Sequence, residues 1–491
     1  MSNTTIFCCI IFYISNDYFF FVKVAVYFLM DSWIQELRFP HLSIPITIDS
    51  IDSVSPITES NPNTTLYLSN LDDMIGVRVF TPTVYFYRAT GSKHHQESVM
   101  QVLKDSLSRV LVPYYPFSGR LRETENGKLE VFFGPNQGAL LVEAHSDVAL
   151  EDLGDLTVPN PAWIKLIYKF PNEEQYKVID MPLLIAQVTK FTCGGFSLGL
   201  RICHCLCDGL GAMQFMKAWA ETVKAGCLVV NPKPTWGRET FRPRDPPAIE
   251  FPHAEFKKLE DGSSLTRSLW EVKPVQKCYR ITHEYQARLK RSAQLYGADF
   301  SCSTFDAMAA HVWKSWVKAL DVTPLDYELR LTFSINTRHK IKNPPLKDGF
   351  YGNALCVACA TSTVERLIHG SLNETARLVN SVRLGISERY VRSTIDYVEL
   401  NRPKRLEFGG KLSITQWTRF CIYESGDFGW GRPVYAGPID LTPTPQVCLF
   451  LPEGGGSEAG GAMVLCICLP EYACCRFKEL LSLKPGTGPQ T

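Results

Sequence analysis

The sequence predicts a mixed α/β fold in two large domains. Short apolar runs typical of strands alternate along the chain with segments whose apolar residues recur every three or four positions, as on one face of a helix. The chain has 491 residues, about three times a typical domain length. Six prolines fall between residues 232 and 252, where neither a helix nor a central strand can continue. We therefore expect two α/β domains with mixed sheets, joined by an extended crossover.

Strands and a helix are predicted early in the chain. Residues 77–87 are rich in β-branched and aromatic side chains, and Pro82 among them predicts a sheet edge or a bulge. Apolar residues with helical spacing follow at 99–111. A strand pair is predicted next, at residues 121–123 and 128–133.

The most regular stretch combines a buried hairpin with a helix. Two apolar runs at residues 184–190 and 196–203 are joined by Cys193-Gly194-Gly195, which is a hairpin signal. From residue 213 onward, apolar side chains recur at helical spacing until Gly226, which is typical of a helix C-cap. Residues between the second run and the helix should therefore lie at the end of a rigid strand.

His204, Asp208 and Gly209 occupy that position and are the candidate catalytic motif, H-x-x-x-D-G. A histidine can accept a proton from a hydroxyl near neutral pH when its ring is held within hydrogen-bond reach of that group. A strand end beside a cleft can hold the ring, and Gly209 would permit a sharp exit of the chain. The alternative is that His204 is an ordinary, partly buried histidine.

The second half of the chain again mixes helices and strands. A helix is predicted at residues 301–320, where Ser303 and Asp306 resemble a capping box. His311 within this helix is expected to be packed or solvated rather than catalytic. Residues 427–431 set two large aromatic side chains among small and charged residues, which predicts a tight turn packed by its rings. Strands are expected at residues 354–360, 447–451 and 463–469.

Composition is that of a soluble globular protein. Hydrophobic residues make up 45% of the chain and charged residues 21%. The formal net charge of +1 supplies no electrostatic footprint for nucleic acid or for an anionic membrane. The sequence also lacks phosphate-loop and nucleic-acid motifs, so we expect no nucleic-acid partner.

The 17 cysteines are scattered, odd in number and partly within apolar runs. This distribution favours reduced thiols in a cytoplasmic protein over a disulfide framework. Cys356 and Cys359 have the spacing of zinc ligands, but they lie in an apolar run without a clear second pair. The cysteines at 203, 205 and 207 flank His204 on an apolar strand. We expect a metal at neither place.

The first residues differ from the rest of the chain. Apolar runs at 6–14 and 19–29 are interrupted by polar and charged residues, so no clean span of about 18 to 20 apolar residues exists. A signal peptide would have an early positive charge and a small-residue cleavage site, and neither is evident. We expect residues 1–42 to be an atypical extension, of which 1–29 are dispensable. A weak membrane anchor is the alternative.

Several motifs together resemble those of the plant BAHD acyltransferases. The H-x-x-x-D-G motif at 204–209 and the D-F-G-W-G motif at 427–431 look like the paired signatures of this family. Residues 115–120 resemble its Y-P-L-A-G-R motif, and residues 351–354 resemble F-G-N-A. The resemblance covers roughly residues 55–481 and is closest to the branch that esterifies alcohols.

This resemblance implies two domains that are each similar to chloramphenicol acetyltransferase, with an active-site channel at their interface. The domains would span residues 43–231 and 261–491, and residues 232–260 would be the crossover. His204 would be the general base, and Asp208 would pair with an arginine, for which Arg338 is the candidate.

Other residues of the motifs would line the channel or support it. Thr415 would face His204 and donate a hydrogen bond to the developing oxyanion, and Trp417 would line the same channel. Structural roles are implied for Gly209, Arg338, Asp427, Phe428, Gly429, Trp430 and Gly431.

The implied activity is acyl-CoA-dependent O-acylation of an alcohol. Acyl-CoA would be a co-substrate, the acceptor would be an uncharged hydroxylated small molecule, and no cofactor would be needed. The acyl group would pass directly to the acceptor, without a covalent enzyme intermediate. A cytoplasmic monomer without stable membrane insertion is expected.

Three alternatives stay open. A cysteine at 203, 205 or 207 could be an acyl-accepting nucleophile, although direct neighbours of His204 on a strand point to its opposite face. The chain could be a non-catalytic, BAHD-like binding or regulatory protein. A peptide-synthetase condensation domain is related in motif, but that pattern has a second histidine where this chain has Cys203.

Overall fold

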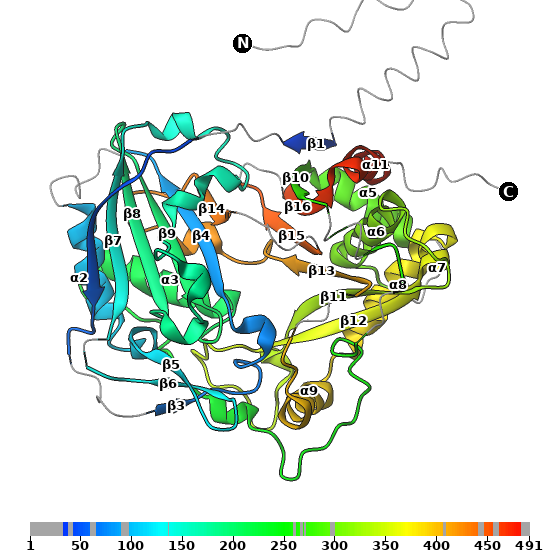
Figure 1. The fold of residues 1–491 in the computed structure, drawn as a ribbon, viewed down its shortest axis with the longest axis horizontal. Helices are drawn as coiled ribbons and strands as arrows, with labels where there is room; N and C mark the ends of the chain where they lie inside the picture. Colours follow the sequence, from blue (N-terminus) through cyan, green and yellow to red (C-terminus); the bar gives the residue numbers. More distant parts are fainter. Residues whose placement is uncertain are drawn as a thin grey trace, which may run out of the picture.

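The computed structural model describes most of the chain between residues 33 and 482. The described residues are 33–37, 43–58, 65–89, 98–135, 137–258, 262–265, 269, 272–294, 300–405, 409–439, 446–454 and 461–482. They form two halves, each built on a large mixed sheet with its own hydrophobic core, and the two sheets lie on either side of the centre of the molecule (Figure 1). The predicted mixed α/β fold is confirmed.

The N-terminal half contains a six-stranded sheet in the order β14-β4-β9-β8-β7-β2, in which only β7 and β8 are parallel. The predicted hairpin is its centre: β8 and β9 are almost wholly buried because both of their faces carry apolar side chains. Gly194 turns between them with φ of +80°. The strands are β2 (Thr47–Val54), β4 (Phe80–Tyr87), β7 (Ala139–Ser146), β8 (Leu184–Phe191), β9 (Phe196–Cys203) and β14 (Tyr435–Pro438).

Helices α2 (Val99–Val110) and α3 (Gly209–Ala225) belong to the same half. Helix α3 ends at Gly226, whose left-handed conformation is that of the predicted C-cap. A separate three-stranded sheet holds the predicted strand pair, in the order β3 (Thr65–Tyr67), β6 (Leu129–Phe132), β5 (Arg120–Glu123).

Pro82 is placed differently from the simplest prediction. Strand β4 is second from the edge of its sheet and pairs with β9 along its whole length, without a bulge. Its other neighbour, β14, pairs only with residues 83–86. Pro82 therefore lies just beyond the end of β14, where its missing N–H costs no ladder hydrogen bond.

The C-terminal half contains a seven-stranded sheet in the order β1-β10-β16-β15-β13-β11-β12, and β13 is parallel to both of its neighbours. Its strands are β1 (Ile34–Leu37), β10 (Pro274–Ile281), β11 (Glu328–Asn336), β12 (Leu355–Thr363), β13 (Lys411–Gln416), β15 (Val447–Pro452) and β16 (Met463–Pro470). Its helices are α5 (His283–Gln294), α6 (Thr304–Ala319), α7 (Val364–His369), α8 (Leu372–Gly385), α9 (Glu388–Asn401) and α11 (Glu471–Ser482), whereas α10 (Ile422–Ser425) packs with α3 in the core of the N-terminal half.

Helix α6 is the core helix of this half and begins as predicted. Ser303 and Asp306 form a reciprocal capping box, with backbone-to-side-chain distances of 3.1 and 2.9 Å. His311 is a packed residue: its Nε2 lies 2.9 Å from the carbonyl oxygen of Leu481 and 3.2 Å from the hydroxyl of Tyr285. Burial lowers its pKa.

Two strands do not follow the boundaries expected from the sequence. Strand β1 lies within the expected extension, residues 1–42, yet it pairs with β10 at the edge of the seven-stranded sheet. Strand β14 lies within the expected C-terminal domain, residues 261–491, yet it completes the six-stranded sheet. Each sheet therefore has, at one edge, a strand from the part of the sequence that mainly forms the other half. This exchange of strands links the two halves.

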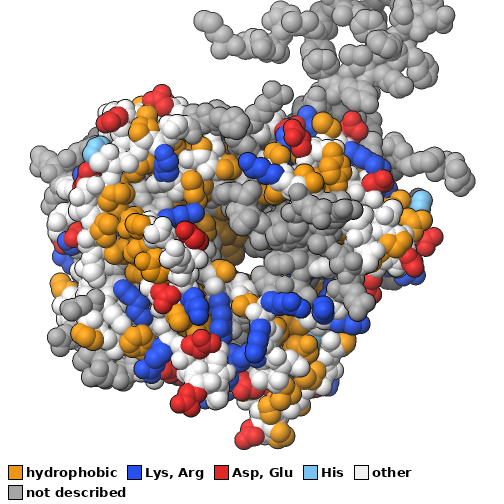
Figure 2. Space-filling model, viewed as in Figure 1, with side chains coloured by type: hydrophobic (Ala, Val, Ile, Leu, Met, Phe, Trp, Pro, Cys, Tyr) orange, Lys and Arg blue, Asp and Glu red, His pale blue; other side chains and the backbone are white. Residues whose placement is uncertain are grey.

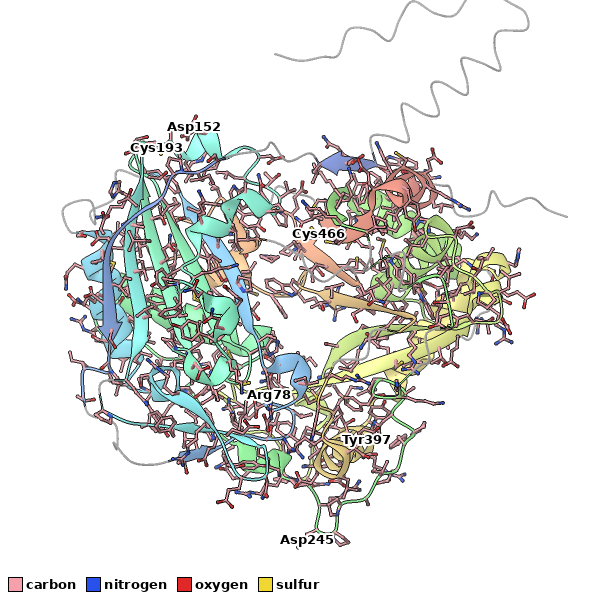
Figure 3. All side chains as sticks on the ribbon, viewed as in Figure 1. Arg78, Asp152, Cys193, Asp245, Tyr397 and Cys466 are labelled. Carbon is pink, nitrogen blue, oxygen red and sulfur yellow. The ribbon has the colours of Figure 1, made fainter. Side chains whose placement is uncertain are left out.

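The Pro-rich segment connects the halves as an extended chain. Between α3 and residue 258 it contains one short 3-10 helix, Arg238–Phe241, and an isolated bridge from Thr235 to Phe350. It projects from the molecule as a loop with Asp245 at its tip (Figures 1 and 3).

No helix of the described part of the chain is long and apolar enough to cross a membrane. Residues 1–29, expected to be dispensable, lie outside the described residues, and so does most of the glycine-rich loop between β15 and β16.

Candidate active site

A cavity of about 1630 Å³ lies between the two halves. One wall comes from β4, β9 and the first turns of α3, and the opposite wall from β11, β12, β13 and β15. Figure 2 shows the surface hollowed near the centre of the molecule. Small-molecule sites commonly measure about 300 to 1000 Å³, so this cavity has room for two substrates.

His204 stands in the first wall, directly after β9. Its backbone N–H donates to the carbonyl oxygen of Val79 at 2.8 Å, which continues the pairing of β9 with β4. The side chain lines the cavity, but Nδ1 is buried and has no hydrogen-bond partner among the described residues. Nε2 is therefore the ring nitrogen available to a bound molecule.

Asp208 pairs with Arg338, the partner that the family resemblance implies. Its carboxylate accepts two hydrogen bonds of 2.8 Å from the guanidinium of Arg338, in the bidentate geometry typical of strong pairs. It also accepts from the backbone N–H groups of Gly211 at 3.0 Å and Ala354 at 3.1 Å, and the former makes it the N-cap of α3. Asp208 is 1% exposed. All of these bonds hold the loop after His204, and none reaches the imidazole.

Gly209 is required for a reason other than the one predicted. It is not among the glycines with positive φ, so the sharp exit of the chain does not depend on it. A Cβ atom at this position would instead lie 2.3 Å from the ring of Phe420, which follows β13 and packs against the core of the N-terminal half. The glycine is needed because this ring closely approaches the start of α3.

A second buried carboxylate, Asp72, supports the peptide of His204 through Asn353. The side-chain amide of Asn353 donates to the carbonyl oxygen of His204 at 2.7 Å and to Asp72 at 3.0 Å. The backbone N–H of Asn353 donates to the same carboxylate, which also accepts from the Ser69 hydroxyl. No role was predicted for Asp72 or Asn353. The only sequence signal was the family-like motif at 351–354.

Thr415 and Trp417 line the cavity from the wall opposite His204. On β13, Leu412 and Ile414 point into the hydrophobic core, so Thr415 faces the cavity by alternation. The predicted position of Thr415 across from His204 agrees with this arrangement, and its role as a hydrogen-bond donor stays a prediction.

The turn at 427–431 is packed by its aromatic rings. Phe428 packs edge to face on Trp219 of α3 with a centroid distance of 5.3 Å, and Trp430 packs similarly on Phe196 of β9. Gly429 and Gly431 adopt positive φ values of 94° and 91°. No residue from 427 to 431 lines the cavity, so the turn contributes packing rather than cavity wall.

Arginines from both halves meet at the rim of the cavity. Asp73 accepts from Arg78 at 2.9 Å and from Arg402, which follows α9, at 2.8 Å. Burial raises the pKa of Asp73, and the two guanidinium groups oppose that effect. Both arginines line the cavity, and Figure 3 places Arg78 between the halves. The rim therefore presents positive charge to an entering molecule.

The cysteines beside His204 are poorly suited to act as nucleophiles. Cys203 and Cys205 are fully buried, and Cys207 is 3% exposed. Burial holds the pKa of the Cys207 thiol well above its usual value, and a hydrogen bond with Cys203 together with burial does so for Cys205. The thiol, not the reactive thiolate, is then the form present near neutral pH.

The thiols of Cys356 and Cys359 do not point toward a common site. Cys356 points into the core, and a residue three positions later on a strand points to the opposite face. Among the described residues, no group of three or more histidine, cysteine, aspartate or glutamate side chains is arranged to hold a metal ion.

A hydroxyl–imidazole–carboxylate chain occurs at the crossover, where Glu255 lines the cavity but His253 and Ser393 do not. His253 lies 2.7 Å from the Ser393 hydroxyl and 2.9 Å from Glu255. Ser393 is fully buried and already accepts from the backbone of Glu250. A substrate cannot reach this serine, and the chain serves to fasten the crossover to α9.

Known proteins share this architecture and much of this sequence. A family model described as the Transferase family matches residues 44–483. An alcohol acyl transferase 1 allele of Malus domestica is 35% identical over 428 residues, which cover 86% of this chain and 91% of that protein. The omega-hydroxypalmitate O-feruloyl transferase of Arabidopsis thaliana is 35% identical over 420 residues, covering 84% of this chain and 88% of the relative.

The fold is also found among solved structures. Vinorine synthase superimposes with a TM-score of 0.66 at 21% identity, covering 90% of this chain and 99% of its own. The family match over most of the chain and these relatives agree with the paired motifs at His204 and Asp427. The chain belongs to this transferase family, the BAHD acyltransferases.

Proposed function

We propose that the protein transfers an acyl group from acyl-CoA to the hydroxyl of an uncharged, largely apolar alcohol, with His204 as the general base. The observation that carries this proposal is the placement of His204 in the wall of a two-substrate cavity, with Nδ1 buried and Nε2 left for the acceptor. The names of the relatives, which describe acyl transfer to alcohols, support the same reaction.

The reaction needs little beyond a positioned base. Nε2 of His204 takes the proton of the acceptor hydroxyl as its oxygen bonds to the thioester carbonyl carbon. The carbonyl oxygen becomes an oxyanion, to which Thr415 donates a hydrogen bond. When the oxyanion collapses, the carbon–sulfur bond breaks and the CoA thiolate takes the proton back from His204. The ester and free CoA leave, and no enzyme group is acylated.

The lining of the cavity supports this choice of substrates. Met213 and Met216 of α3 face Val357 and Leu449 of the opposite sheet, which suits an apolar acyl or alcohol chain. The arginines at the rim suit the phosphates of CoA. Acyl-CoA is in this proposal a co-substrate, and we include no cofactor or metal.

We also infer a cytoplasmic monomer. All 15 cysteines of the described residues are free thiols, four of them exposed, which suits a reducing compartment. The intact His204 loop with its paired Asp208 supports a catalytic protein over a binding protein of the same fold.

The test is ester formation by the purified protein. Acetyl-, benzoyl-, hydroxycinnamoyl- and long-chain acyl-CoA are each incubated with a pooled alcohol library, and products are identified by mass while free CoA is titrated. We expect at least one ester, formed in equal amount with CoA. His204→Ala is the matched control and should form the ester roughly 10²- to 10⁴-fold more slowly. A near-normal rate in this variant, or acylated protein after mixing with acyl-CoA alone, would refute the mechanism.

A further inference from the structure

A second cavity of about 570 Å³ adjoins the first, and nothing in the proposed reaction uses it. Its volume lies within the range of small-molecule sites. It is lined from α6, the end of β13, and strands β15 and β16. The two linings share Phe305, Gln416, Arg419 and Phe420. Any molecule extending from the first cavity into the second must pass these residues.

Phe420 is the shared residue that touches the H-x-x-x-D-G motif. Its ring packs on Gly209 so closely that any side chain there would overlap it, with a 2.3 Å distance from ring carbon to a Cβ atom. Its backbone N–H donates to the carbonyl oxygen of Trp417 at 2.8 Å, and the two rings lie 5.7 Å apart. The ring is thus held in place from both halves, beside the loop that carries His204.

The second cavity suits an apolar chain better than a charged group. Phe305, Met308, Phe450 and Met463 contribute its apolar lining. Two of its charged lining residues, Arg432 and Glu424, form an ion pair, and a third, Glu453, pairs with Arg280. A linear hydrocarbon chain would gain apolar burial here, whereas a phosphate would face the carboxylates of Glu424 and Glu453, which offset the charges of Arg432 and Arg419.

We propose that Phe420 is a specificity-determining residue: its ring closes the passage from the His204 cavity to the second cavity and limits the length of the apolar substrate chain that fits. This inference rests on the proposed acyl transfer. The chain can belong to the acyl group of the donor or to the alcohol. Shortening the side chain joins the two cavities and opens the second one to longer chains.

The experiment compares Phe420→Ala with wild type in two homologous series. In one, saturated acyl-CoAs from acetyl to palmitoyl are paired with a short alcohol; in the other, alcohols from butanol to hexadecanol are paired with acetyl-CoA. In one series, the ratio of kcat/KM for the longest member to kcat/KM for the shortest should be roughly tenfold or more higher in the variant than in wild type. The reason is that the additional methylene groups of a long chain can then bind in the second cavity. The series that responds identifies which substrate carries the chain.

Phe420→Leu is the matched control, since it retains most of the side-chain bulk and should keep a profile close to wild type. An equal fall of kcat/KM for every chain length in both series would overturn the proposal. Calorimetric binding of unreactive S-acetonyl- and S-hexadecyl-CoA thioethers, and of the two alcohols, gives a readout without turnover. The ratio of long-chain to short-chain affinity should rise in Phe420→Ala in the same way, even if the wild-type protein forms no ester. If this ratio rose neither for the thioethers nor for the alcohols, the proposal would be overturned independently of His204.

Discussion

The two signature turns of this protein hold an aspartate by different means. Asp208 is 1% exposed, pairs with Arg338 through two short hydrogen bonds and caps α3. Asp427 has a side chain that is 39% exposed, accepts from the backbone of Gly429 at 3.0 Å, and lies 3.9 Å from Lys224. The first turn borders the cavity, and the second does not.

This difference separates two uses of a sequence motif. The turn after His204 is held by polar contacts that fix direction and distance, as a group that must meet a substrate requires. The turn at 427–431 is held by Phe428 and Trp430, whose rings fill space against α3 and β9. We therefore expect changes in the first turn to act on catalysis, and changes in the second to act on stability.

The largest effect should come from His204→Ala. The variant removes the proposed base while leaving the backbone bonds to Val79 and Asn353 in place, so the thermal midpoint should stay near that of wild type. The rate of ester formation should fall roughly 10²- to 10⁴-fold, the usual contribution of a general base. Steady-state kinetics and thermal unfolding measure the two quantities, and near-normal turnover would refute the assignment.

A double-mutant cycle tests the pair beneath the same turn. Asp208→Asn and Arg338→Met each leave a partner charge with reduced compensation at a buried site, and breaking such a pair costs about 3 to 5 kcal/mol. Both single variants should lose stability and activity together, and the double variant should lose less stability than the sum of the two. Denaturant titration measures this, and strictly additive losses would contradict the contact.

In the second turn, Phe428→Ala should act on stability with little effect on the reaction. The ring is 1% exposed and packs between Tyr87 and Trp219. Removing a buried phenylalanine ring costs about 3 to 5 kcal/mol. At low temperature, the activity of the folded fraction should match wild type. A loss of turnover in fully folded protein would mean that this turn shapes the active site after all.

The parts of the fold that local patterns specify were predictable. The hairpin before His204, the cap of α3 at Gly226 and the capping box of α6 all follow from residues close together in sequence. The pairing of Asp208 with Arg338 came from the resemblance to the family, because no local rule joins residues 130 positions apart.

Other features depend on contacts that no local pattern records. Strands β1 and β14 exchange between the halves, and a four-residue strand does not indicate its sheet. The bonds from Asn353 to His204 and Asp72 join residues 149 and 281 positions apart. The sequence suggests a turn role for Gly209, whereas its real constraint is the ring of Phe420, which is distant in the sequence.

A smaller effect is expected from Asn353→Ala, which tests the support of the first turn. The variant removes both amide donors, to the His204 carbonyl and to Asp72. A small displacement of His204 should lower kcat roughly 10- to 100-fold with little change in KM, because misplaced reacting groups lose rate rather than binding. Asn401→Ala, an exposed asparagine of α9, is the control and should behave as wild type. An equal rise in KM with kcat unchanged would indicate a binding role instead.

The smallest effect should come from Asp427→Asn, the counterpart of Asp208→Asn in the other turn. The amide oxygen can still accept from the N–H of Gly429, so the turn keeps its local hydrogen bond. Only the charge facing Lys224 is lost, and exposed pairs of this kind contribute about 0 to 1 kcal/mol. We expect unfolding free energy within about 0.5 kcal/mol of wild type, unchanged turnover, and a difference that shrinks further at 1 M salt because exposed charges are screened. Denaturant titrations at low and high salt measure this beside Asp208→Asn. If the two variants lost equal unfolding free energy, exposure and partner geometry would not distinguish the two aspartates. The contrast between the two turns would then fail.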